Sequence, residues 1–121
     1  MSRQKGLRPE VAKHLPMRPP VLHLLLSLAS APGYGYALKQ EVERRTAGTV
    51  RLGPATLYES IQRMERRGLI EEVPTPAEDD DRRRTWSITK LGRQALTAEV
   101  KRLDEVVRHA RAIKLLPGLS A

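Results

Sequence analysis

The stretch Gly53-Pro-Ala-Thr-Leu-Tyr-Glu-Ser-Ile-Gln-Arg-Met-Glu-Arg-Arg-Gly-Leu-Ile70 decides how this 121-residue chain is expected to fold. At about 100° per residue, Leu57, Ile61 and Met64 fall on one side of a helix, and small, polar and arginine side chains fall on the other. A proline suits the first helical turn, and a glycine suits the position just after the last. The pattern predicts a helix over 54–67 that packs by one narrow apolar face.

Two further helices are expected before this one. The first begins at a pair of prolines and covers 19–30; it carries leucines on nearly every side, which indicates the most buried element. A break at 31–33 separates it from a second helix over 34–46, whose apolar residues lie one turn apart. A short turn with a short extended piece, over 47–53, then joins this helix to the next. Two helices joined in this way are typical of a helix-turn-helix.

A β-hairpin is expected to follow. Residues 69–73 and 84–88 have the composition of short strands, and the second alternates, with Trp86 and Ile88 on one face. Between them lies a loop over 74–83, rich in proline and charge, that is expected to be mobile. The fold class predicted is mainly α with a small β-hairpin: a winged helix-turn-helix, followed by a long C-terminal helix.

The C-terminal helix is expected to begin after Thr89, a good N-cap residue, and to run to about residue 116. Its apolar residues recur at alternating spacings of four and three, which is the seam of a paired helix. Val106 and Ile113 widen the stripe. The predicted dimer interface consists of Leu96, Val100, Leu103, Val107 and Ala110.

Three regions are predicted along the chain. Residues 1–18 form a basic N-terminal arm, for which flexibility is expected and a short helix over 9–15 is the alternative. Residues 19–89 form the winged helix-turn-helix. Residues 90–121 form the dimerisation helix and a tail.

Composition points to a polyanionic partner. The formal charge is +8, from 22 Lys and Arg against 14 Asp and Glu, with a pI near 10.4. Such an excess favours nucleic acid first and an anionic membrane second, although a merely soluble basic protein would look the same. The longest apolar run, 21–29, is far shorter than the roughly 20 residues of a membrane span, and no signal-peptide layout surrounds it. No membrane association is expected. The absence of cysteine excludes disulfides and thiolate sites, and it fits a cytoplasmic location.

Nothing in the sequence indicates catalysis or a cofactor. There is no nucleophile with its base, no glycine-rich phosphate loop and no scaffolded carboxylate pair. The acidic run Glu78-Asp-Asp-Asp81 lacks the alternating ligands, central glycine and closing glutamate of a calcium loop, so a solvated loop without metal is expected. His14, His23 and His109 lack ligand spacing, and His23 is expected to be a satisfied histidine in the core or an interface.

The polar face of helix 54–67 offers the donors and acceptors that base edges require, and a small side chain or the Thr56 methyl could meet a thymine methyl. Its N-terminal half, through Glu59, is expected to read bases, and the arginines near its end are expected to meet phosphates, as is the Tyr58 hydroxyl. An ordinary solvated helix face is the alternative. The predicted DNA-contacting residues of this helix are Pro54, Ala55, Thr56, Tyr58, Glu59, Gln62, Arg63, Arg66 and Arg67.

Four segments resemble, in order, the signatures of the PadR family of bacterial transcriptional regulators. They are Gly33-Tyr-Gly-Tyr-Ala-Leu38, Gly53-Pro-Ala-Thr-Leu-Tyr58, Arg66-Arg-Gly-Leu-Ile70 and Arg84-Thr-Trp-Ser-Ile-Thr-Lys-Leu-Gly-Arg93. The resemblance covers about residues 19–95. It implies a homodimer built by the C-terminal helix and repression of genes by operator binding. It also implies recognition roles for Thr56, Leu57 and Tyr58.

The hairpin over 69–89 takes the role of the wing in this resemblance. Its acidic tip at 78–81 would repel phosphates, so the DNA contacts expected there are Arg82, Arg83 and Arg84. A small-molecule effector is possible, but no site for one is evident, because the C-terminal seam is aliphatic and the aromatic residues lie in the DNA-binding half. The partners expected are double-stranded DNA, in the form of an inverted repeat, and a second copy of the chain. The alternatives are a winged-helix module that docks on an acidic protein and a DNA-coating protein without sequence preference.

Overall fold

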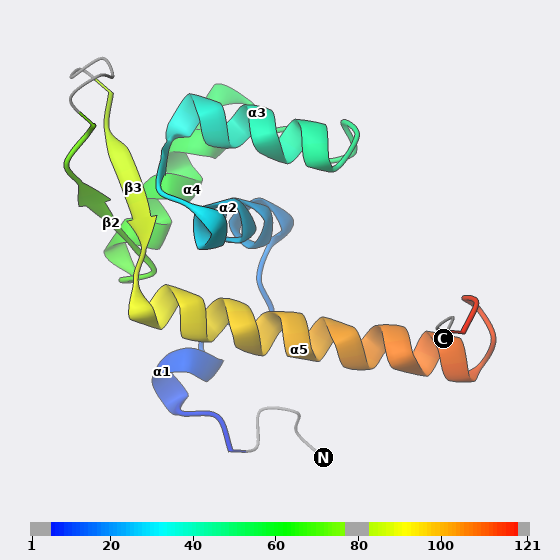
Figure 1. Cartoon of the computed structure of the whole chain (residues 1–121). Coiled ribbons are helices and arrows are strands. Elements are labelled where there is room, and N and C mark those ends of the chain that lie inside the picture. The colour runs from blue at the N-terminus through cyan, green and yellow to red at the C-terminus, as the bar shows by residue number, and fades with distance from the viewer. Residues whose placement is uncertain (1–5, 77–82, 119–121) are drawn as a thin grey trace.

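The computed structural model describes residues 6–76 and 83–118. It is mainly helical with one small antiparallel sheet and a long C-terminal helix (Figure 1), which confirms the predicted fold class. The elements in order are α1 (Pro9–Ala12), α2 (Pro19–Ser30), β1 (Gly33–Tyr34), α3 (Gly35–Arg45), α4 (Pro54–Arg66), β2 (Ile70–Val73), β3 (Thr85–Ile88) and α5 (Lys90–Ala112).

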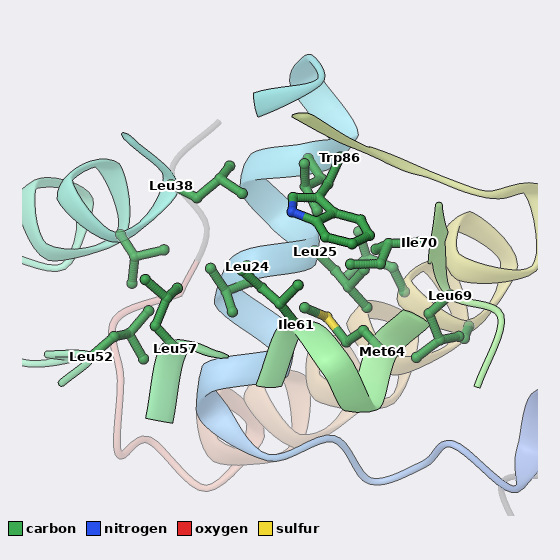
Figure 2. Close-up of a cluster of buried hydrophobic side chains, with 14 of the residues drawn as sticks. Leu24, Leu25, Leu38, Leu52, Leu57, Ile61, Met64, Leu69, Ile70 and Trp86 are labelled. Atoms are coloured by element: carbon green, nitrogen blue, oxygen red, sulfur yellow. The ribbon is translucent and has the colours of Figure 1, made fainter. Parts of the chain in front are cut away.

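The core is built around α2, as its leucine content predicts. Leu24 and Leu25 have no exposed surface, and the apolar face of α4 packs in the same cluster (Figure 2). That face consists of Leu57, Ile61 and Met64, each at most 6% exposed, which confirms the inward face predicted for this helix. Burying a side chain of this size stabilises the fold by roughly 1.5–3 kcal/mol, so these three contacts fix which side of α4 meets solvent.

The sheet has three strands rather than the two predicted. The order is β1-β3-β2, with Gly33 opposite Trp86 and Ile70 opposite Ile88. Thr85 and Trp86, which alternate along β3, are both buried. β3 is the middle strand of the sheet, and the Thr85 hydroxyl donates to the Thr75 hydroxyl at 3.2 Å.

Hydrogen bonds join the end of α4 to the start of α5. Gly68 has a φ of +76°, and the N–H of Leu69 donates to the carbonyl of Met64 at 2.9 Å, which is a Schellman ending. The Thr89 hydroxyl accepts the Gly92 N–H at 3.0 Å, which confirms the predicted N-cap of α5. The same hydroxyl donates to the carbonyl of Gly68. The wing strands therefore leave and return at one fixed junction.

The N-terminal arm is ordered against the body over its described part, so the expected flexibility is wrong there. The alternative of a short helix is confirmed by α1, although α1 ends at Ala12 rather than at residue 15. Val11 and His14 are buried, and α1 packs against α5. The Met17 N–H donates to a carboxylate oxygen of Glu99 at 2.9 Å. These contacts link residues some eighty positions apart, which no local pattern reveals.

The last helix differs from its prediction at both ends of its apolar stripe. It ends at Ala112 rather than near residue 116, because Lys114 adopts a φ of +68° and the Leu115 N–H returns to the carbonyl of Ala110. Leu96, predicted in the dimer interface, is 5% exposed and belongs to the chain's own core. It is therefore removed from that interface. The second half of α5 extends beyond the body (Figure 1).

Candidate nucleic-acid interface

The polar face of α4 is exposed along its length. Of the nine residues predicted to contact DNA from this helix and its end, only Arg63 is half-buried, and Tyr58 is 66% exposed. The exposed residues are Pro54, Ala55, Thr56, Tyr58, Glu59, Gln62, Arg66 and Arg67. Because Leu57, Ile61 and Met64 hold the opposite side in the core, this face is presented in one orientation.

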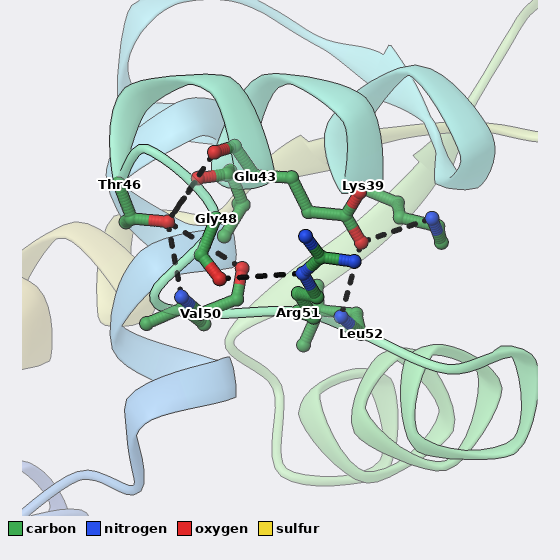
Figure 3. Close-up of polar contacts among 8 residues, drawn as sticks. Lys39, Glu43, Thr46, Gly48, Val50, Arg51 and Leu52 are labelled. Carbon is green, nitrogen blue, oxygen red and sulfur yellow. Dashed lines mark hydrogen bonds and ion pairs between the residues drawn. The ribbon is translucent and has the colours of Figure 1, made fainter.

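The turn between α3 and α4 is fixed by a side chain at the end of α3. The Thr46 hydroxyl donates to the carbonyl of Val42 at 2.8 Å and accepts the N–H of Val50 at 3.2 Å (Figure 3). Ala47 and Gly48 both have positive φ, and the Gly48 N–H donates to the carbonyl of Glu43 at 2.8 Å. The helix ends as a Schellman motif that turns the chain toward α4.

Glu43 bridges this turn. Its carboxylate accepts the Leu52 N–H at 3.3 Å and pairs with the Lys39 ammonium at 2.9 Å (Figure 3). The hydrogen bond from Lys39 lowers the pKa of Glu43 from its usual value, and the bond from Leu52 adds to this effect. Leu52 is 1% exposed, so its side chain and its backbone are both tied down just before α4 begins.

The wing arginines lie on aromatic rings. The guanidinium of Arg83 is 4.3 Å from the centre of the Tyr34 ring, and that of Arg84 is 4.9 Å from the Trp86 ring. Arg84 also pairs with Glu72 across the hairpin at 2.8 Å, which lowers the pKa of the Glu72 carboxyl. Arg84 is thus already engaged within the chain. Arg82 and the acidic tip at 78–81 lie outside the described residues.

A groove of about 540 Å³ separates α3 and α4 from the wing. Tyr36, which is 58% exposed, and Lys39 line it from α3, and Tyr58 lines it from α4. The sequence reasoning did not name Tyr36 or Lys39 as candidate contacts. The sequence did contain one signal for this groove: all of its aromatic residues lie in this half of the chain. The structure places all four of them, Tyr34, Tyr36, Tyr58 and Trp86, in the lining of the groove.

His23 is a half-buried histidine beside Arg45. A guanidinium nitrogen of Arg45 donates to the His23 carbonyl at 2.9 Å and lies 3.5 Å from the ring Nδ1. Burial lowers the pKa of His23, and the charge of Arg45 lowers it further. The expectation of a satisfied structural histidine agrees with these contacts.

Among the helices of residues 6–76 and 83–118, none combines the length and the hydropathy that a membrane span requires. Within the same residues, no three His, Asp or Glu side chains gather as a metal site would require.

A helix-turn-helix followed at once by a β-hairpin, with the outer helix polar and exposed, is a winged helix-turn-helix, an architecture typical of DNA-binding transcriptional regulators. The model of the transcriptional regulator PadR-like family matches residues 21–98. The chain belongs to this family, which consists of regulators and not of enzymes.

Individual relatives agree with this assignment. The transcriptional regulator Rv3488 of Mycobacterium tuberculosis is 34% identical over 87 residues, which are 72% of this chain and 78% of that protein. An uncharacterised protein X of Lysinibacillus sphaericus is 37% identical over 73 residues, 60% of this chain and 67% of that protein. A PadR family transcription regulator of Clostridium difficile has a similar structure, with a TM-score of 0.66 at 20% identity. The match covers 78% of this chain and 96% of that one, and it shows the shared fold.

Proposed function

We propose that this PadR-family regulator is a homodimeric, sequence-specific repressor that places the N-terminal half of α4 in the major groove of DNA. The observation that carries the proposal is the exposed polar face of α4, which its own buried face holds in one orientation. The β2–β3 hairpin would act as the wing beside it. The net charge of +8 supports a polyanionic partner.

The roles proposed for α4 follow from position. Ala55, Thr56 and Glu59 are exposed on its first two turns, where a recognition helix enters a groove deepest. Arg66 and Arg67 are exposed at its end, where a long cationic side chain suits a phosphate rather than a base.

Dimerisation is proposed through the second half of α5. Val100 is 43% exposed, Val106 is 50% exposed and Ile113 is 54% exposed, which together form an apolar stripe without a partner in the described chain. Leu103 and Val107 lie half-buried on the same stripe. A two-fold dimer would carry two copies of α4 and would therefore prefer an inverted repeat with half-sites about one helical turn apart.

Selection of bound duplexes from a random pool tests the proposal. The expected result is an enriched inverted repeat. Thr56→Ala should change which bases are preferred, whereas Arg66→Ala should weaken all duplexes alike and lower the slope of log affinity against log salt by about one. Arg108→Ala, on the exposed surface of α5, is the charge-matched control and should leave both properties unchanged. Equal retention of every duplex by the wild type would contradict sequence specificity.

Repression is tested separately with a reporter gene placed behind the selected site. Expression of the wild-type chain should lower reporter output, and Thr56→Ala should relieve that effect at the original site. A rise in output with the wild type would instead identify an activator.

A further inference from the structure

A second, smaller pocket lies on the other side of α4, between the N-terminal segment and the C-terminal half of this helix. Its volume is about 180 Å³. Lys13 and Arg18 line it from the N-terminal segment, and Arg63 and Arg67 line it from α4 and the residue after it. Four cationic side chains from segments some fifty residues apart thus meet at one cavity.

His14 completes the lining of this pocket. It is 7% exposed, and its ring nitrogen Nε2 is buried with no hydrogen-bond partner among the described residues. Buried polar nitrogens in folded proteins nearly always have a partner, so an orphan of this kind requires an explanation. A bound group that reaches the ring would supply one.

The charged side chains that line the pocket around His14 are all positive. Burial lowers its pKa most, and the neighbouring charges of Lys13 and Arg67 lower it further. No Asp or Glu lines the pocket among the described residues. The nearby Glu99 carboxylate is already bonded to Arg102 at 2.7 Å and to the Met17 N–H. A compact anion would therefore meet donors and positive charge on several sides, and it would favour the protonated, donating form of His14.

The size of the pocket restricts the ligand. A volume of about 180 Å³ is below the roughly 300–1,000 Å³ of sites for drug-sized molecules, but it accommodates a tetrahedral oxyanion with some water. Arginine side chains present several N–H donors to phosphate oxygens in a fixed geometry.

We propose that this pocket binds a phosphate group. The group can come from two sources: the DNA backbone beside the recognition helix, or a free phosphate or phosphorylated small molecule. Only the first source rests on the DNA-binding function proposed above. If the backbone is the source, the N-terminal segment joins the DNA interface and extends it past the end of α4.

The first test follows the imidazole NMR signals of the three histidines during titration with sodium phosphate, at constant ionic strength against sodium chloride. The His14 signal should shift saturably in phosphate alone, and the pKa of His14 should rise, while His23 and His109 serve as internal references. Arg67→Gln should weaken the response by about tenfold, because one charged donor is lost. Arg108→Gln, equal in charge change and remote from the pocket, should not.

The second test distinguishes the sources with the selected duplex. If the backbone supplies the phosphate, duplex binding shifts the His14 signal, and Lys13→Gln, at a pocket residue outside the contacts proposed for α4, lowers the salt slope by about one while Arg108→Gln does not. If only inorganic phosphate shifts His14, the ligand is a free oxyanion, and this result stands even if no duplex is bound. A His14 signal that responds to neither phosphate nor duplex would overturn the proposal.

Discussion

At the residue scale, Gly92 occupies a position where no side chain fits. It belongs to the segment 84–93, the last of the four that resemble the PadR signatures. It lies in the first turn of α5, where helix propensity alone would favour alanine. A Cβ atom there would overlap the carbonyl oxygen of Leu69 and would lie 2.9 Å from a side-chain carbon of Ile88. The glycine thus permits α5 to start directly against the junction of α4 and the wing.

Gly92→Ala is expected to destabilise the fold by about 1–3 kcal/mol, because backbone and not a mobile side chain occupies the space. Thermal or urea unfolding measures the change. Thr97→Ala, an exposed position of the same helix, is the matched control and should leave stability within about 0.5 kcal/mol. Equal stability of the two variants would show that the junction does not need this close approach.

At Ala47, too, the backbone conformation determines which amino acid is most stable at the position. Its φ of +52° places an alanine in the left-handed region, which costs a residue with a Cβ roughly 1–2 kcal/mol. Ala47→Gly should therefore stabilise the fold by about 0.5–1 kcal/mol, after the greater flexibility of the unfolded glycine is subtracted. Ala37→Gly, within α3, should destabilise it by about 1 kcal/mol. Urea midpoints that fall in both variants would contradict the strain argument.

At the element scale, the N-terminal segment is hydrogen-bonded to α5 through one buried carboxylate, that of Glu99. Glu99 is 1% exposed; it accepts two bonds from Arg102, at 2.7 and 3.0 Å, and one from the Met17 N–H. The bond from Arg102 lowers the pKa of Glu99 most, and the bond from Met17 lowers it further. Since the folded pKa lies below the usual value of 4.5, this stabilisation is fully present above about pH 4.5 and is lost as pH falls through the folded pKa.

Glu99→Gln is expected to lower the free energy of unfolding by about 1–3 kcal/mol at pH 7, because a neutral amide cannot replace both charge-assisted bonds. The variant should also lose part of the fall in stability between neutral and acidic pH. Urea unfolding at several pH values measures both effects. Glu71→Gln, at an exposed site in β2, is the control and should keep the wild-type pH profile. A Glu99→Gln profile that parallels the wild type would refute the role given to this carboxylate.

The elements that were predictable from sequence are those with a local signature. Leu57, Ile61 and Met64 at helical spacing defined α4 and its exposed face, and Thr89 marked the start of α5. β1 has only two residues and no periodicity, so only its pairing with β3 reveals it. The burial of Leu96 and the docking of residues 8–17 depend on contacts between distant segments, which spacing along the chain does not encode.

At the scale of the whole molecule, the two halves of α5 have different surroundings. On a helical projection, Leu96 and Glu99 share a face with Leu103 and Val107 further along. The first pair is buried against the body, the second pair is half-buried, and the second half of α5 extends beyond the body (Figure 1). The same stripe therefore forms the monomer core in its first half and is partly exposed in its second. Continuity of this kind supports a partner helix of the same character, which a second copy of the chain would supply.

Leu103→Glu tests this arrangement, because a dimer would bury two unpaired carboxylates at its centre. The dimer dissociation constant should rise roughly 100-fold or more, as measured by sedimentation or light scattering across concentrations. Affinity for an inverted repeat should fall toward that for one half-site, because the second copy of α4 is no longer tethered. Lys101→Glu places the same side chain on the opposite side of α5 and should remain dimeric. If Leu103→Glu dimerises as well as Lys101→Glu, the partner surface lies elsewhere on the molecule.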